Sequence, residues 1–231
     1  MEWKDQEADV IERCRGEAGE IQLQRRGAEY EIIYNGVFLM ATYNGASEKA
    51  AVREALKLIT SRKEGPVKVL MGGLGVGFSL REALDWKQVN QVVVCEIEPA
   101  VIRWNRAILG QVNGNGLYDN RVKIIKGDFL MVLEDQAAAI SGDPLRAFDV
   151  VVVDTDNGSS WLSLPANEYL YRNEGLRLIK QCLIPGGAAC FWCPDREVLF
   201  EKRLAENYSE VHFHTSIEKT GQESAYYLVV K

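Results

Sequence analysis

The chain has 231 residues, a length that fits one α/β domain with a small appendage. Its 47% hydrophobic content is too high for a disordered chain, and its formal net charge of −6 argues against a nucleic-acid-binding surface, which needs clustered Lys and Arg. Because the start lacks the apolar core of a signal peptide and no apolar run approaches the roughly 18–20 residues that span a membrane, we expect a soluble cytoplasmic protein without a nucleic-acid or membrane partner.

The first 46 residues are expected to form a short helix and a small β-meander. Apolar residues at helical spacing predict an amphipathic helix over residues 2–15. Three short apolar runs follow between residues 20 and 43, and the turn signals Arg26-Gly27 and Asn35-Gly36 separate them. We therefore divide the chain into residues 1–46 and a main domain at 47–231.

The main domain alternates strands and helices. Ser47 is the expected N-cap of a helix near 48–62. Short apolar, often β-branched runs then predict five strands, and the valine runs indicate strands that helices cover on both faces. These strands are expected at 67–71, 91–95, 122–125, 148–153 and 188–192.

The end of the chain breaks this alternation, since residues 211–217 and 225–230 flank a turn at Gly221 and predict a hairpin. A mostly parallel sheet that ends in an antiparallel hairpin is typical of the class I methyltransferase fold. We expect this Rossmann-like, doubly wound α/β sheet after the small N-terminal β-meander.

A glycine-rich segment lies between the predicted strand 67–71 and a helix predicted over 78–84. Its glycines are Gly72, Gly73, Gly75 and Gly77. Glycines at such a turn let the backbone approach a ligand, and the helix N-terminus supplies free N–H groups. The alternative is a tight turn that serves packing alone.

Acidic residues follow the next three predicted strands. Glu96 lies 19 residues after Gly77, where a carboxylate can bind ribose hydroxyls; the alternative is a cap for a helix that starts at Pro99. Asp128 can accept the adenine amino group, and a helix N-cap is compatible with that role. Asp154 ends its strand at the sheet edge where ligands bind and can face the reacting centre. The expected cofactor site also includes Ile97 and Phe129.

The glycine spacing excludes the nicotinamide-binding fingerprint, which needs a third glycine three residues after the second. That position holds Leu80 in one register and Phe78 in the other. A Gly-x-Gly-x-Gly loop is instead the S-adenosylmethionine form. The expected cofactor is S-adenosylmethionine or a relative, namely decarboxylated S-adenosylmethionine or methylthioadenosine.

From about residue 19 to 193 the chain resembles the spermidine synthase family. The resemblance rests on the β-meander, the apolar Met71 where most methyltransferases carry an acid, and the segments 93–99, 127–128 and 148–154. It implies that Glu96 binds ribose and Asp128 binds adenine. It also implies that Asp154 is the catalytic acid that accepts a proton from the attacking amine.

The chain also departs from that family at positions expected to hold the polyamine. Val76 replaces an acid in the glycine loop, Gly19 replaces a glutamine before the first strand, and Ala51-Val52 replaces a tyrosine and its polar neighbour. The second acid after the fourth strand is missing or shifted to Asp156. A cationic diamine would lose counter-charge, so methyl transfer to a small molecule is placed before aminopropyl transfer, with a non-catalytic nucleoside sensor as a third hypothesis.

The acceptor is expected to bind a polar and aromatic segment that follows the fourth strand, and an amine fits it best. The alternative is that its aromatic rings cover the sheet edge. His212 and His214 share one face of a predicted strand, but no third ligand lies nearby, so no metal site is expected there. None is expected at the Cys190-x-x-Cys193 spacing either, because residues three apart on a strand face opposite sides. Strand edges near the N-terminus are compatible with a homodimer. The predicted acceptor residues are Asp156, Asn157, Trp161 and Tyr169.

Overall fold

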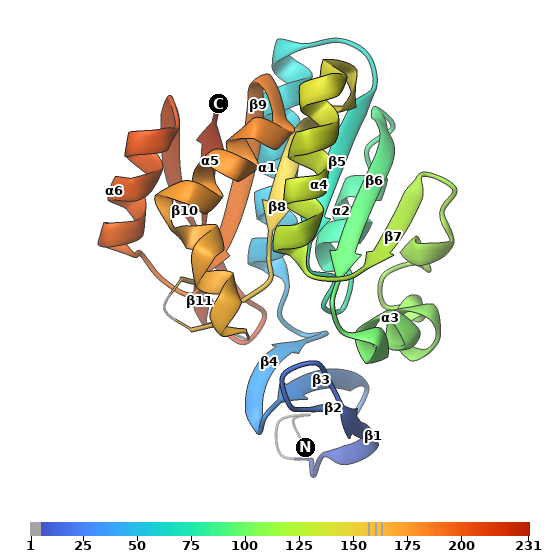
Figure 1. Cartoon of the computed structure of the whole chain (residues 1–231). Helices are drawn as coiled ribbons and strands as arrows, with labels where there is room; N and C mark the ends of the chain where they lie inside the picture. The colour runs from blue at the N-terminus through green and yellow to red at the C-terminus, as the bar shows by residue number, and fades with distance from the viewer. Residues whose placement is uncertain (1–5, 157, 160, 163) are drawn as a thin grey trace.

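The computed structural model describes residues 6–156, 158–159, 161–162 and 164–231, and it contains two sheets (Figure 1). The small sheet is an antiparallel meander in the order β1-β2-β3-β4, and the large sheet has the order β10-β11-β9-β8-β5-β6-β7. The large sheet is parallel from β9 to β7 and antiparallel at β10 and β11, which confirms the predicted fold class.

The expected N-terminal helix is wrong over the residues that the structure describes. Residues Asp9–Arg15 form strand β1, which pairs with β2 (Glu20–Arg26) at the edge of the small sheet. Val10 and Ile11 stay 50% and 39% exposed, so their helical spacing did not mark a buried face. The backbone hydrogen bonds that β2 offers decide the conformation here, and a local pattern cannot record them. Residues 1–5 lie outside the described part.

The rest of the meander follows the turn signals. Strands β3 (Glu29–Tyr34) and β4 (Val37–Ala41) are joined by Asn35 and Gly36, with φ angles of 50° and 76°. This left-handed pair is what a two-residue hairpin turn requires, and Asn and Gly tolerate it best. The predicted hairpin is confirmed.

Helix α1 (Ala46–Arg62) starts two residues before the predicted start, and Ser47 is not its cap. Gly45 holds the N-cap position, and the carboxylate of Glu218 accepts hydrogen bonds from the backbone N–H groups of Gly45 at 2.7 Å, Ala46 at 2.9 Å and Ser47 at 3.1 Å. An acid at a helix N-terminus satisfies free donors and complements the helix dipole. The capping residue is 171 positions from Ser47, so no local pattern around Ser47 indicates it.

The parallel strands of the large sheet all point the same way, so their carboxyl ends lie along one edge of the sheet. Its parallel strands are β5 (Val67–Gly72), β6 (Val89–Glu96), β7 (Val122–Lys126), β8 (Phe148–Val153) and β9 (Leu183–Cys193), and its hairpin consists of β10 (Glu210–Ile217) and β11 (Glu223–Val230). The chain runs outward from β5 to β7 and then returns to β8 on the other side of β5. This reversal makes the carboxyl ends of β5 and β8 the topological switch point, where open α/β sheets bind ligands.

Helices cover both faces of the large sheet (Figure 1). Val150 and Val152 belong to a buried cluster with the first three helices, while Val151 and Val153 belong to a second cluster with the last three. Side chains alternate along a strand, so a continuous valine run serves both faces. Cys190 and Cys193 fall in opposite clusters, as predicted. The helices after α1 are α2 (Phe78–Leu84), α3 (Pro99–Arg106), α4 (Phe129–Gly142), α5 (Asn173–Cys182) and α6 (Val198–Asn207).

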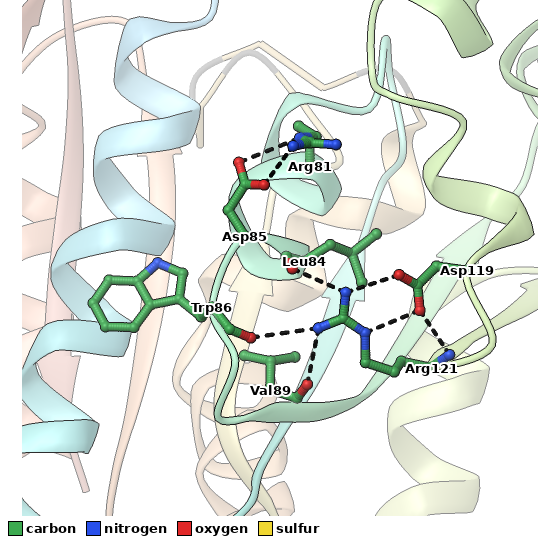
Figure 2. A network of polar contacts seen from close by, with 7 residues as sticks. All are labelled: Arg81, Leu84, Asp85, Trp86, Val89, Asp119 and Arg121. Carbon is green, nitrogen blue, oxygen red and sulfur yellow. Dashed lines mark hydrogen bonds and ion pairs between the residues drawn. The ribbon is translucent and has the colours of Figure 1, made fainter.

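A single arginine ties α2 to the outer strands of the large sheet (Figure 2). The guanidinium of Arg121 donates to the carbonyl oxygens of Leu84 at 2.9 Å and Val89 at 3.1 Å, and it also binds both carboxylate oxygens of Asp119. The planar group thus satisfies the carbonyl of the last residue of α2, Leu84, and that of the first residue of β6, Val89. The ion pair lowers the pKa of Asp119 to about 2. Within the described chain, no helix combines the length and apolar character needed to cross a membrane.

Candidate functional site

One cavity lies at the switch point and collects most of the predicted site residues. They come from the ends of β5, β6, β7 and β8, whose carboxyl ends meet at one sheet edge. The predicted residues that line this main cavity are Gly73, Gly75, Glu96, Ile97, Asp128, Phe129, Asp154 and Asp156.

The small N-terminal sheet forms another wall of the main cavity. Tyr34 and Met40 line it, and the Met40 sulfur lies 3.0 Å from the backbone nitrogen of Val76 in the glycine loop. The Tyr34 hydroxyl donates to Glu98 at 2.7 Å, which connects the small sheet to the segment after β6. The sequence analysis missed this wall, because it treated the meander as a separate unit.

The glycine loop has two kinds of glycine. Gly73 (φ 93°) and Gly75 (φ 52°) line the main cavity, and an added Cβ would lie 2.0 Å from the Asp154 carbonyl oxygen and 2.2 Å from the Met40 sulfur, respectively. Both the left-handed backbone and the close neighbours therefore require glycine.

Gly72 and Gly77 are a correction to the predicted site, because among the described residues they do not line the main cavity. A Cβ on Gly72 would lie 2.4 Å from the Phe129 ring, and one on Gly77 would lie 2.6 Å from the Asn113 amide. These two glycines serve close packing around the loop.

Glu96 is 8% exposed and anchors the backbone on either side of the main cavity. One carboxylate oxygen accepts from the Leu74 N–H at 2.9 Å, and the other accepts from the Glu98 N–H at 2.8 Å. Burial raises the pKa of Glu96, and these two backbone bonds oppose that rise. Each oxygen keeps a second lone pair for a ligand hydroxyl, so the ribose role stays open to Glu96.

Asp128 caps helix α4. Its Oδ1 accepts from the Leu130 N–H at 2.8 Å, while the residue also lines the main cavity. The predicted N-cap is confirmed, and the predicted contact with adenine remains a prediction.

Asp154 lies between the glycine loop and the first turn of α1. Burial raises its pKa to about 8, and the neighbouring carboxylate of Glu48 is the next cause. The Ser79 hydroxyl, 3.5 Å from Oδ2, has the opposite and weaker effect. A carboxyl with a pKa near neutrality can exchange a proton with a bound substrate at cellular pH.

Asp156 is buried and firmly held at the same edge. The Thr155 hydroxyl donates to it at 2.8 Å and the Asn167 amide at 2.9 Å, and the Tyr171 hydroxyl lies 3.3 Å away. All three bonds orient the carboxylate where it lines the main cavity. The second acid that the sequence analysis described as missing or shifted is therefore present at the cavity.

The structure brings only part of the predicted acceptor set to the main cavity, where Asp156 lies. In the described part of the chain neither Trp161 nor Tyr169 lines the main cavity, and Asn157 lies outside the described residues. Residues 165–171 form the 3₁₀ helix η5 (Pro165–Tyr171), in which residues three apart share a face. Asn167 lines the cavity, and Tyr169, two positions later, is turned to another side.

Trp192 is the aromatic residue that the sequence analysis missed. It lies near the carboxyl end of β9 and lines the main cavity, and its indole nitrogen donates to the Ser47 hydroxyl at 2.9 Å. The rule that selected Asp154 at the end of β8 also selects Trp192 at the end of β9.

The main cavity is strongly acidic. Among the described residues that line it, there are carboxylates but no Lys, Arg or His. Glu98 is one of two acids that the sequence analysis did not assign, and its Oε2 is buried without a hydrogen-bond partner among the described groups. The six acids are Glu48, Glu96, Glu98, Asp128, Asp154 and Asp156.

Residues that the sequence analysis set aside as metal ligands lie away from this cavity. His212 and His214 share a face of β10, with ring centroids 6.3 Å apart. Over the described ranges, no group of three or more His, Cys, Asp and Glu side chains is arranged to hold a metal ion.

Sequence comparison points to one family. The profile described as "Spermine/spermidine synthase domain" matches residues 51–229. A polyamine aminopropyltransferase of Mycobacterium tuberculosis is 30% identical over 168 residues, which cover 73% of this chain and 29% of the relative. Another, of Aeropyrum pernix, is 28% identical over 180 residues, or 78% of this chain and 53% of the relative. The chain thus spans less than a third of the first relative and about half of the second.

Comparison with solved structures supports the same fold. Spermidine synthase from Thermotoga maritima has a TM-score of 0.78 at 18% identity, and the match covers 96% of this chain and 73% of that one. A spermidine synthase in complex with the transition state analogue AdoDATO has a TM-score of 0.77 at 18% identity, with 96% and 72% coverage. These matches include the N-terminal meander, which lies outside the region that the profile matches.

Proposed function

Because the chain belongs to the spermine/spermidine synthase family, we propose that it transfers an aminopropyl group from decarboxylated S-adenosylmethionine to a small-molecule amine. The observation that carries the proposal is the acidic main cavity, where six acids and no described basic side chain surround the space. Such a cavity complements cations. The proposed donor carries a sulfonium and an ammonium, and the acceptor carries a further ammonium.

This proposal reverses the order in which the sequence analysis placed the two reactions. The relatives named above support aminopropyl transfer and give no specific support to methyl transfer. The charge of the donor supports the same order, because S-adenosylmethionine has a carboxylate that its decarboxylated form lacks. In a cavity lined by six acids, that carboxylate would have no basic partner among the described lining residues.

The site residues take roles that follow from their places. The glycine loop at Gly73 and Gly75 lets the nucleoside approach the backbone, Glu96 binds the ribose hydroxyls and Asp128 the adenine. Asp154 accepts the proton that the acceptor amine loses. Its pKa of about 8 falls when cationic substrates bind, because opposite charges favour the carboxylate. Asp154 therefore becomes a base when both substrates are present.

The lost polyamine-site groups have counterparts in the structure. The sequence departs from the family pattern at Val76 and Ala51, but Glu48 and Asp156 bring carboxylates to the same cavity. Asp156 can therefore supply counter-charge for an amine, and Glu48 supplies a further carboxyl group.

Product analysis tests the proposal. The protein is incubated with either donor and a panel of amines that includes putrescine and spermidine, and products are identified by mass spectrometry. We expect an aminopropylated amine and methylthioadenosine from the decarboxylated donor. A methylated product from S-adenosylmethionine would restore methyl transfer, and nucleoside binding without any product would favour a sensor.

Donor binding gives a second test. By calorimetry, decarboxylated S-adenosylmethionine should bind at least about tenfold more tightly than S-adenosylmethionine, a difference of roughly 1.4 kcal/mol. Equal affinities would contradict the charge argument. A homodimer is a separate proposal, which light scattering of the purified protein decides.

A further inference from the structure

A second cavity adjoins the main cavity, and Glu48 and Trp192 line both. The second cavity lies between β4, the start of α1 and the turn that joins β10 to β11. Gln222, an exposed residue of that turn, also lines it, so the second cavity reaches the protein surface. Glu48 therefore stands between the main cavity and a space that solvent can enter.

Glu48 and Glu218 are connected by one hydroxyl. The Ser47 Oγ lies 2.7 Å from Glu48 Oε2 and 2.8 Å from Glu218 Oε1, and it accepts a hydrogen bond from the Trp192 indole nitrogen at 2.9 Å. Ser47 is 0% exposed, while Glu48 and Glu218 are 8% and 4% exposed. The three groups form a continuous chain between the two cavities.

The single hydroxyl proton of Ser47 cannot serve both neighbouring carboxyls, so either Glu48 or Glu218 carries a proton of its own. A serine hydroxyl has one proton to donate and can accept from two donors. Trp192 occupies one accepting position, and the Ser47 proton serves only one of the two carboxyls. The other carboxyl must supply its own proton to form a hydrogen bond at these distances.

The surroundings assign that proton to Glu48. Glu218 accepts three backbone N–H bonds at the α1 N-terminus; burial acts to raise its pKa, but these bonds outweigh it and the pKa is lowered. Burial raises the pKa of Glu48, and its charged neighbours are Glu218, Asp154 and the more weakly acting Lys49. The opposite pKa shifts of the two acids favour a proton on Glu48 rather than on Glu218.

We propose that Glu48, Ser47 and Glu218 form a proton relay that carries the proton released by the reaction from Asp154 in the main cavity to the second cavity. The inference rests on the proposed function. When the amine attacks the donor carbon, a C–N bond forms, the C–S bond breaks and its electron pair stays on the sulfur of the neutral nucleoside product. The amine proton goes to Asp154, which must lose it before the next turnover.

The relay moves this proton without leaving a net charge on Glu48 or Ser47. Asp154 and Glu48 line the same cavity, where the proton of Asp154 passes to the Glu48 carboxyl; Glu48 then gives the proton of its Oε2 to Ser47, and Ser47 gives its hydroxyl proton to Glu218. Glu218 then releases a proton into the second cavity, which its lowered pKa favours. The two oxygens of one carboxyl let Glu48 accept and donate together. Glu48, Ser47 and Glu218 therefore act as positioning and proton-transfer groups behind the catalytic acid.

Infrared spectroscopy tests the resting proton without any need for turnover. In the Asp154→Asn protein at pH 7, Asp154 contributes no carboxyl signal, and we expect a carbonyl stretch from a protonated carboxylic acid. This band should disappear in the Asp154→Asn, Glu48→Gln double variant. An unchanged spectrum in that region would show that Glu48 is ionised and would overturn the relay.

Kinetics test proton transfer itself. Ser47→Ala should lower kcat at least tenfold while the Kd for methylthioadenosine stays within twofold. Ser47→Thr keeps the hydroxyl and should restore the rate, and imidazole should raise the rate of Ser47→Ala in proportion to its concentration, because a small buffer can replace the relay. Ser61→Ala, in the last turns of the same helix, is the matched control.

Two kinetic results would also overturn the relay: a Ser47→Ala rate within twofold of the wild type, or a loss that neither imidazole nor Ser47→Thr restores. Thermal unfolding of each variant separates a folding defect from a rate defect. If the wild type transfers no aminopropyl group to any amine, the proposed function fails, and the infrared comparison still decides the proton on Glu48.

Discussion

Substitution of Glu96 by glutamine separates its structural role from its ligand role. Both oxygens of Glu96 accept backbone N–H bonds, from Leu74 at 2.9 Å and from Glu98 at 2.8 Å. Glutamine keeps one acceptor oxygen and places an NH₂ group at the other position, so one buried N–H loses its partner. An unsatisfied buried donor costs about 1–3 kcal/mol, and we expect the free energy of unfolding to fall by that amount.

The ligand role predicts a second, separate loss. If the charged carboxylate binds the ribose hydroxyls, Glu96→Gln should weaken binding of methylthioadenosine by about 1–3 kcal/mol, or roughly 5- to 150-fold in Kd. Urea unfolding measures the first effect, and calorimetry at a temperature where both proteins are folded measures the second. Glu134→Gln, an exposed residue of α4, is the matched control and should change neither value.

The two measurements can refute the reasoning independently. A folded Glu96→Gln protein with unchanged Kd would mean that Glu96 only anchors the backbone around the main cavity. Unchanged stability with weaker binding would mean that the two backbone bonds contribute little. Both roles are supported only if Glu96→Gln lowers the free energy of unfolding and also lowers the affinity for methylthioadenosine.

The remaining predictions concern charge, the arginine clamp and the glycine loop. Because the pKa of Asp154 is about 8 when folded and near 3.8 when unfolded, the folded state binds the extra proton between these values and stability falls as pH rises through them. Asp154→Asn should therefore abolish transfer yet raise the melting temperature relative to the wild type at pH 8, with a smaller gain at pH 5; a lower melting temperature at pH 8 contradicts this. Arg121→Lys loses the planar contacts to Leu84 and Val89 and should cost about 1–3 kcal/mol in urea unfolding; a value near zero would reject the clamp. Gly75→Ala places a Cβ against the Met40 sulfur in a left-handed backbone and should weaken nucleoside binding at least tenfold by calorimetry, whereas wild-type affinity would show that the loop adapts.

Much of the fold could be predicted because its signals are local. Valine runs such as residues 150–153 predicted strands buried on both faces, and Asn35-Gly36 predicted a hairpin turn. The failure at β1 has the opposite cause. Its residues form a strand because β2 lies beside them, and Val10 and Ile11 carry no pattern that reports the partner.

The candidate site divides in the same way. Glu96, Asp128 and Asp154 could be selected because each follows a parallel strand, and the carboxyl ends of such strands meet at one edge. On the acceptor side, Trp192 of the next strand lines the main cavity, whereas Tyr169 of the 3₁₀ helix after β8 does not. The helical phase of a few residues decides which side chains face the cavity, and this phase cannot be predicted from amino-acid composition.

The sequence by itself therefore determined the sheet, the glycine loop and the row of acids at the strand ends. All of these depend on spacing within one segment or on the rule that orders parallel strands. Only the tertiary structure decided that the small sheet forms a wall of the main cavity and that the Glu48 carboxyl lines this cavity together with Asp154. It also placed Ser47 within hydrogen-bond reach of Glu218, 171 residues away. Contacts of this kind form only when segments distant in the sequence pack together, so no periodicity or motif within either segment predicts them.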